Sequence, residues 1–223
     1  MTIGLYIAVI VVGYLIGSIP FGLIIARIVT KTDIRTIGSG KIGMTNVMRA
    51  AGTKAAVVSV ALDAGKGALS VVLAWLILPD NPEAAGLIGG LAAIAGHNWS
   101  IYLGFKGGRG VATFIGGIAA MYWPAALVGG IIIFGLGFQS RYMSLGSISG
   151  SVIAFVYMAV MTILGINFLF PAPPFLYLIY ALIGCIFVYV MHYDNIHRLM
   201  TGTERKIGEK SPSGPATSKT SLK

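Results

Sequence analysis

The sequence predicts an all-α, polytopic membrane protein with seven transmembrane helices, its N-terminus outside and its C-terminus in the cytoplasm. Hydrophobic residues occupy 56% of the 223 positions and charged residues only 10%. A soluble chain of this length needs far more charge to cover its surface. Several apolar runs approach the roughly 20 residues that cross a bilayer as a helix. Lys and Arg collect between alternate runs, which indicates the orientation of the chain.

The spans follow from the apolar runs in chain order. Five of them are clear, at about residues 3–28, 55–78, 84–103, 144–165 and 175–192. The segment 111–138 is ambiguous, because as one helix it would be about 42 Å long. Alternatively it forms two short helices broken around Met121–Pro124. Pro124 lacks a backbone donor and disfavours the helical conformation at Trp123, which favours a break there.

Basic residues decide between one helix and two in this segment. With two helices, one side of the membrane holds the loops 29–54, 104–110 and 139–143 and the C-terminal tail. That side then carries every Lys and Arg except Lys66, which lies within a span, and the opposite side carries only Asp80 and Glu83. With one helix, Arg141 and the basic tail share the other side. The positive-inside rule favours seven spans, and it accounts for the net charge of +9 without nucleic acid as a partner.

The domain organisation expected is a single seven-helix membrane domain over residues 1–204. Residues 205–223 are rich in Ser, Thr, Lys, Pro and Gly, and we expect them to form a disordered cytoplasmic tail. The sole cysteine, Cys185, lies in an apolar run and is expected to be a small buried hydrophobe. No Cys/His metal spacing and no carboxylate cluster suited to Mg²⁺ is present, so we expect neither a metal nor a cofactor.

A polar, glycine-rich loop at residues 38–49 is the first candidate site. Glycines let backbone amides approach an anion closely, and hydroxyl, amide and guanidinium groups complete such a cradle. The candidate residues are Gly38, Ser39, Gly40, Gly43, Thr45, Asn46 and Arg49. This composition predicts binding of a phosphate group.

A second loop of this kind follows at Phe105–Thr113. Lys106, Gly107, Gly108 and Arg109 stand just before the next apolar run, and the N-terminus of a helix favours anions. The alternative is a basic anchor that contacts lipid phosphates, which would need the charges but not the glycines. Two phosphate-type loops indicate anionic substrates handled at the membrane surface.

Two polar groups lie within or beside the spans. Asp63 and Lys66 are three residues apart in the second span, where they form either a structural ion pair or part of the site. His97 lies directly before the second loop, either as a packing residue or as a member of the site.

A third polar cluster follows the last span. His192, Asn195 and Arg198 are separated by three-residue steps and share a face if the helix continues. The alternative is a helix end whose side chains extend into the lipid headgroups.

Together these clusters resemble the bacterial acyl-phosphate:glycerol-3-phosphate acyltransferases, the PlsY family, over about residues 10–205. The motifs are Gly17-Ser-Ile-Pro-Phe-Gly22, Gly38-Ser-Gly with Gly43-Met-Thr-Asn46 and Arg49, Asp63-Ala-Gly-Lys-Gly67, Gly96-His97, Phe105-Lys-Gly-Gly-Arg-Gly-Val-Ala-Thr113, and Asn195-Ile-His-Arg-Leu with Gly202-Thr-Glu204. Two positions depart from the family pattern, which usually has Asn in place of Lys41 and of His197.

The resemblance implies transfer of a fatty acyl group from acyl phosphate to the 1-hydroxyl of glycerol 3-phosphate, the first step of bacterial phospholipid synthesis. The site would face the cytoplasm from the inner membrane, and the products would be lysophosphatidic acid and phosphate. The candidate catalytic residues are Ser39, Arg49, Lys106, His192 and Asn195. In this interpretation the first loop holds the acyl phosphate, while Arg49, Lys106 and Arg109 hold glycerol 3-phosphate and stabilise developing charge.

The general base is left open between His192, which with Asn195 would orient the hydroxyl, and a substrate phosphate. Acyl phosphate is already activated, so positioning and charge stabilisation suffice without a covalent nucleophile. A membrane transporter of small phosphorylated anions is the alternative function. Its site would be expected near the midplane with inverted repeats, whereas the polar motifs gather at one face.

Overall fold

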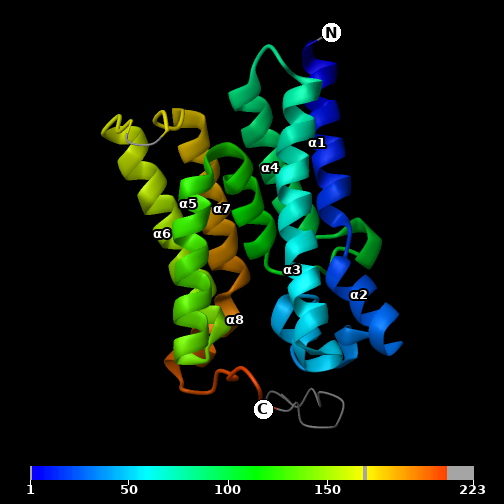
Figure 1. Cartoon of the computed structure of the whole chain (residues 1–223). Helices are drawn as coiled ribbons and strands as arrows, with labels where there is room; N and C mark the ends of the chain where they lie inside the picture. Colours follow the sequence, from blue (N-terminus) through cyan, green and yellow to red (C-terminus); the bar gives the residue numbers. More distant parts are fainter. Residues whose placement is uncertain (1, 168–169, 210–223) are drawn as a thin grey trace, which may run out of the picture.

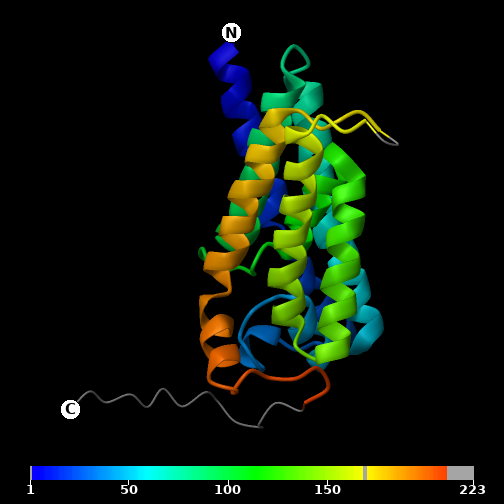
Figure 2. The same ribbon diagram turned by 90° about the vertical axis from the view of Figure 1, so that its left-hand side faces the viewer.

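The computed structural model describes residues 2–167 and 170–209, and every long element in these ranges is an α-helix (Figure 1). The helices are α1 (Thr2–Ser18), α2 (Phe21–Thr30), α3 (Met44–Ile77), α4 (Pro82–Asn98), α5 (Val111–Ser140), α6 (Met143–Ile163), α7 (Phe175–Met191) and α8 (Tyr193–Met200), with 3₁₀ turns η1 (Ile34–Thr36) and η2 (Ile101–Leu103). They form a bundle in which α1 begins at one end and α8 lies at the other (Figures 1 and 2).

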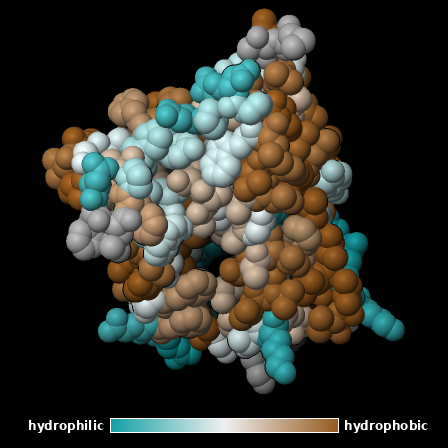
Figure 3. Space-filling view, turned by 45° about the horizontal axis from the view of Figure 1, so that its top comes forward, coloured by the Kyte–Doolittle hydropathy of each residue, from teal (hydrophilic) through white to brown (hydrophobic). Residues whose placement is uncertain are grey.

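The bundle has the features of a membrane protein. By length and composition, α1 with α2, α3, α5 and α6 are candidate spans, and α7 with α8 would be a fifth although the pair is bent by 60°. Large apolar side chains are exposed along these helices, for example Ile7, Leu76, Ile131 and Ile186. Figure 3 shows that this outer surface is mostly hydrophobic and is hollowed near the centre of the face in view.

Helix α5 is broken at Tyr122, whose φ of −156° and ψ of 82° are not helical. The break lies within the segment Met121–Pro124 for which the sequence predicts it. A straight helix would separate Ile115 and Gly129 by about 21 Å. Instead the Ile115 side chain lies 3.4 Å from the Cβ position of Gly129, and the two segments run antiparallel and side by side in Figure 1. The two-helix alternative for residues 111–138 is therefore the correct one.

Helix α3 has a bend at Gly52, whose φ of +84° is a conformation that glycine adopts without a steric penalty. The bend separates the first two turns, which carry Asn46 and Arg49, from the long remainder of the helix. The first turns can therefore follow the direction of the glycine loop before them.

Small residues set the spacing between helices. A Cβ atom at Gly17 of α1 would overlap the backbone of Ala93 in α4, and one at Gly116 of α5 would overlap the backbone of Ala64 in α3. Close approach of backbones through small residues is the usual way in which helices pack in membranes. These two contacts pack α1 closely against α4 and the first segment of α5 closely against α3.

The first residues of the expected disordered tail contact the helical body. The amide of Ile207 donates to the Arg141 carbonyl at 2.8 Å, and Arg141 Nη2 donates to the Ile207 carbonyl at 2.9 Å. Lys206 lies over the Tyr142 ring, with Nζ 5.8 Å from its centroid. Ordered contacts therefore extend beyond Arg205, and residues 210–223 lie outside the described part of the chain.

Candidate active site

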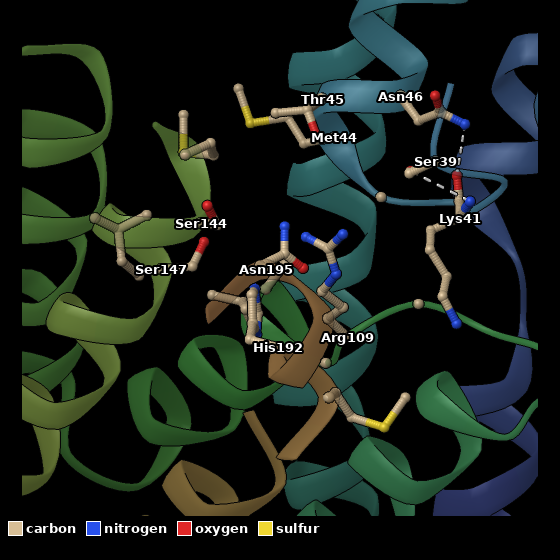
Figure 4. A pocket seen from close by; sticks show the side chains of 18 of the residues that line it. Ser39, Lys41, Met44, Thr45, Asn46, Arg109, Ser144, Ser147, His192 and Asn195 are labelled. Carbon is tan, nitrogen blue, oxygen red and sulfur yellow. Dashed lines mark hydrogen bonds between the residues drawn. The ribbon is translucent and has the colours of Figure 1, made fainter. Parts of the chain in front are cut away.

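A cavity of about 640 Å³ lies where α8 and the segment after it close the end of the bundle. Of the residues predicted for the site, those that line it are Gly38, Ser39, Gly43, Thr45, Asn46, Arg49, Gly108, Arg109, His192 and Asn195. Figure 4 shows Arg109, His192 and Asn195 near one another, with Ser144 on one side and Thr45 on the other. We call this cavity the reaction pocket.

The other predicted residues, Gly40, Lys106 and Gly107, line a second hollow of about 440 Å³. Lys106 and Arg109 are only three residues apart in the chain, yet they face different cavities. Lys41 lines both of them. The structure therefore separates the two cations that the sequence assigns to a single phosphate clamp.

Asn46 holds the first loop together. Its buried Nδ2 lies 2.7 Å from the carbonyl of Ile34, 3.0 Å from that of Ile37 and 2.8 Å from that of Lys41. Because these carbonyls occupy its donor group, the amide fixes the course of the loop. Helix α3 begins beside it at Met44, so the first amides of α3 lie at the pocket wall, where a helix N-terminus attracts an anion.

The second loop folds back onto the end of α4. The amide of Gly107 donates to the Asn98 carbonyl at 3.1 Å, and that of Gly108 donates to the His97 carbonyl at 3.0 Å. A Cβ atom at Gly108 would overlap His97 Nε2. These two glycines thus serve close packing, and their amides are already engaged rather than available to a phosphate.

Arg109 follows these glycines and reaches into the reaction pocket. Burial lowers the pKa of its guanidinium to about 10, with the Glu204 carboxylate acting in the opposite direction. The group therefore remains protonated at neutral pH. Helix α5 begins two residues later at Val111, so a second helix N-terminus lies at the pocket wall beside this cation.

His192 is buried between α7 and α8, with 1% of its surface exposed. Its Nδ1 lies 2.7 Å from the Val188 carbonyl, so Nδ1 carries the hydrogen and Nε2 is left as an acceptor in the neutral ring. A fixed acceptor on the pocket wall can receive a hydrogen bond from a hydroxyl group.

Glu204 joins three side chains at the pocket. Its Oε1 accepts hydrogen bonds from Asn195 Nδ2 at 2.6 Å and from Ser144 Oγ at 2.8 Å, while Oε2 accepts one from Arg198 Nε at 2.7 Å. Burial opposes ionisation, but these donors and the charge of Arg198 outweigh it, and the pKa of Glu204 lies below its ordinary value. Sequence reasoning missed Glu204 and Ser144 as site residues, although Glu204 closes the third motif.

Asp63 and Lys66 form an ion pair, one of the two alternatives for these residues, with Lys66 Nζ 2.7 Å from Asp63 Oδ1. Lys66 also donates to the Ile19 carbonyl at 2.7 Å, at the junction of α1 and α2. His97 Nδ1 lies 3.6 Å from the same carboxylate oxygen. Asp63 and His97 both border the reaction pocket, so the pair connects the wall of the site to the first helices.

Metal binding has little to support it in the residues that the structure describes. No group of three or more His, Cys, Asp or Glu side chains there is arranged to hold a metal ion. Activity without a metal stays a prediction.

The fold and the pocket define a helical membrane protein with a cationic cavity at one end. The chain belongs to the glycerol-3-phosphate acyltransferase family, whose model matches residues 7–202. A protein of Dehalococcoides mccartyi strain CBDB1 named glycerol-3-phosphate acyltransferase 3 is 43% identical over 222 residues, which cover 95% of this chain and 100% of the relative. A glycerol-3-phosphate acyltransferase of Rhodopseudomonas palustris strain BisB5 is 41% identical over 208 residues, which cover 93% of this chain and 99% of the relative.

Solved structures agree with this membership. The crystal structure of PlsY, an integral membrane glycerol 3-phosphate acyltransferase, in its glycerol 3-phosphate form has a TM-score of 0.80 and 33% identity, and covers 91% of this chain and 96% of its own. The lysophosphatidic acid form of PlsY has a TM-score of 0.78 at the same identity, and the match covers 91% of this chain and 95% of the PlsY chain.

Proposed function

We propose that this protein transfers a fatty acyl group from acyl phosphate to the 1-hydroxyl of glycerol 3-phosphate. Family membership supports the acyltransferase activity, and the relatives' names support glycerol 3-phosphate as the acceptor. The observation that carries the proposal is a pocket in which two helix N-termini and the cations Arg49 and Arg109 meet. Two phosphorylated substrates need such a concentration of positive potential.

The pocket also has an apolar wall for the acyl chain. It is formed by side chains of α3 and of both segments of α5, namely Val60, Ala64, Ile115, Ile133 and Phe134. One end of the cavity is thus suited to a phosphate and the other to a hydrocarbon chain. This combination supports acyl phosphate as the donor, with membrane lipid as the medium that supplies it.

The residues act by position and charge. The hydroxyl oxygen of glycerol 3-phosphate attacks the acyl carbon, an ester bond forms, and the bond to the phosphate oxygen breaks. Ser39, Thr45 and the N-terminus of α3 hold the leaving phosphate, while Arg49 and Arg109 hold glycerol 3-phosphate and stabilise the charge that develops. No cofactor is required, because acyl phosphate is an activated anhydride.

The hydroxyl proton goes to a substrate phosphate in this proposal. His192 Nε2 orients the hydroxyl as a hydrogen-bond acceptor, and Asn195 is held beside it by Glu204. A proton taken up by His192 would be buried close to the positive charge of Arg109, which disfavours a general-base role.

The membrane arrangement belongs to the same proposal. Counting α1 with α2, α3, α4, the two segments of α5, α6 and α7 gives seven spans, with residues 1–204 as one domain. The start of α1 and the segment after α8 lie at opposite ends of the bundle, which supports an odd number of spans (Figure 1). The basic residues gather at the end that holds the pocket, which supports a cytoplasmic site in the inner membrane of a bacterium.

Purified protein supplied with palmitoyl phosphate and glycerol 3-phosphate tests the proposal. We expect lysophosphatidic acid and phosphate in equal amounts, and no product when palmitoyl-coenzyme A replaces the acyl phosphate. Protein in liposomes that takes up labelled glycerol 3-phosphate without forming lysophosphatidic acid would contradict the proposal and favour the transporter.

A further inference from the structure

The second hollow is a cationic site that the acyl transfer proposed above does not use. It lies between η1 and the second glycine loop and is lined by Asp33, Arg35, Thr36, Gly40, Lys41, Lys106 and Gly107. The single carboxylate, that of Asp33, is paired with Arg27 at 2.9 Å and with Arg35 at 2.6 Å. The hydrogen bond from Arg35 holds the pKa of Asp33 well below its usual range, so the carboxylate stays ionised within this pairing.

Lys41 and Lys106, the two lysines of the hollow, are available to bind a ligand. Across the described ranges 2–167 and 170–209, neither Lys41 nor Lys106 forms an ion pair. The lining holds three cationic side chains, Arg35, Lys41 and Lys106, and one carboxylate, Asp33, so the hollow has a net positive charge. An anion is therefore the ligand that the charges favour.

Exposed apolar surface borders this charge. Phe105, the residue before Lys106, is 60% exposed, and Ile101 and Tyr102 of η2 are 48% and 56% exposed. Leu103 of η2 packs against the buried cluster that includes Leu23 of α2, so both elements border the same apolar core. Helix α2 exposes Ile24, Ile28 and Val29, with Arg27 as its one charged residue. The hollow thus opens at the edge of the surface that faces lipid.

Phe105 presents an exposed aromatic ring beside Lys106. Its φ is +62°, a left-handed conformation that is uncommon for a bulky residue, yet its ring is exposed rather than packed in the interior. This conformation belongs to the turn after η2, in which the Phe105 amide donates to the Ser100 carbonyl at 2.8 Å. An exposed aromatic ring next to a lysine is the arrangement found where membrane proteins contact the headgroup region.

We propose that the second hollow binds the phosphate headgroup of an anionic phospholipid, whose acyl chains lie over Phe105 and the apolar face of η2 and α2. A volume of about 440 Å³ accommodates a phosphate and its glycerol. The adjoining apolar surface is the reason to assign a lipid rather than a soluble phosphate ester, which would gain nothing from it.

A ligand bound in the second hollow changes the electrostatic potential of the reaction pocket through Lys41. This residue lines both cavities, and Figure 4 shows its side chain extending from the first loop towards the second glycine loop. A lipid phosphate that draws the ammonium group to itself removes positive charge from the reaction pocket. The anionic lipid content of the membrane therefore modulates affinity for the phosphorylated substrates.

Lipid retention measured by native mass spectrometry tests the site without relying on acyl transfer. Detergent-purified protein is mixed with equal amounts of phosphatidic acid, as the anionic probe, and phosphatidylcholine. We expect preferential retention of phosphatidic acid, lowered about fivefold or more by Lys106→Glu and largely kept by Lys106→Arg. Lys54→Glu makes the same charge change at an exposed position on α3 outside both cavities, and is expected to change retention by less than twofold.

Two further arms separate this site from the reaction pocket and from soluble anions. Arg109→Ala is expected to leave retention of phosphatidic acid in place. If it abolishes retention while Lys106→Glu does not, the lipid occupies the reaction pocket and the proposal is wrong. Equal losses in Lys106→Glu and Lys54→Glu, or displacement of the lipid by inorganic phosphate alone, would also overturn it.

Discussion

Asn195 and Glu204 are joined by a hydrogen bond of 2.6 Å between Nδ2 and Oε1. The same oxygen accepts from Ser144 of α6 at 2.8 Å. One carboxylate thus ties α8, the segment after it and α6 into a single wall of the reaction pocket. The bond fixes the amide of Asn195, so that its carbonyl oxygen keeps one orientation beside His192 (Figure 4).

Replacing Glu204 with Ala should lower both turnover and stability. It leaves Asn195 and Arg198 without their acceptor, and an unsatisfied buried polar group costs about 1–3 kcal/mol. We expect kcat to fall at least tenfold and Glu204→Gln to retain more activity than Glu204→Ala. Glu209→Ala, outside the pocket, is the control. Normal kcat in Glu204→Ala would show that Asn195 needs no support.

The lowered pKa of Glu204 gives a pH dependence of stability. A carboxylate whose pKa is lower in the folded state stabilises the protein above its unfolded pKa, and this contribution is lost as the pH falls through the folded value. Thermal unfolding in detergent should therefore show a loss of Tm below about pH 5 that is smaller in Glu204→Gln. Parallel curves for the two proteins would contradict the prediction.

Arg49→Ala should abolish or nearly abolish turnover. A hydrogen bond to a charged group contributes roughly 1.5–3 kcal/mol, and more if it strengthens in the transition state. Arg49→Lys should recover only part of the activity because the two-pronged geometry is lost. Steady-state kinetics with both substrates, with Lys54→Ala as the control, make the comparison. Unchanged KM and kcat in Arg49→Ala would show that the assignment of the first loop to the site is wrong.

His192→Ala distinguishes the two candidate bases. If a substrate phosphate takes the proton, the variant loses activity through binding and alignment, and the acid limb of its pH–rate profile remains. If His192 is the base, the rate falls about 10²–10⁴-fold and the acid limb disappears. We expect the first outcome. A large loss of rate without that limb, at unchanged substrate affinity, would assign the proton to His192.

Lys66→Met should destabilise the protein strongly. It leaves the buried Asp63 carboxylate without its partner, and breaking a buried ion pair from one side costs about 3–5 kcal/mol. The double variant Asp63→Asn with Lys66→Met should recover part of the loss. Thermal unfolding measures the effect, with Lys54→Met as the exposed control. A double variant less stable than Lys66→Met alone would show that Asp63 has another stabilising partner.

The sequence by itself determined the helical membrane fold, the break near Pro124 and most of the pocket. Each of these rests on local causes: apolar runs long enough for a bilayer, a proline that cannot continue a helix, and glycines beside polar groups. Ser39, Arg49, Arg109, His192 and Asn195 all reach the pocket, because each lies in a motif that ends or begins a helix at one end of the bundle.

The tertiary structure alone decided which groups act together. Lys106 and Arg109 belong to one motif, but the second loop folds against α4 so that the two residues line different cavities. Ser144 and Glu204 are 60 residues apart and meet only because α6 packs beside α8. No local sequence pattern encodes such a pair, because its hydrogen bond forms only when the helices are packed in the native arrangement.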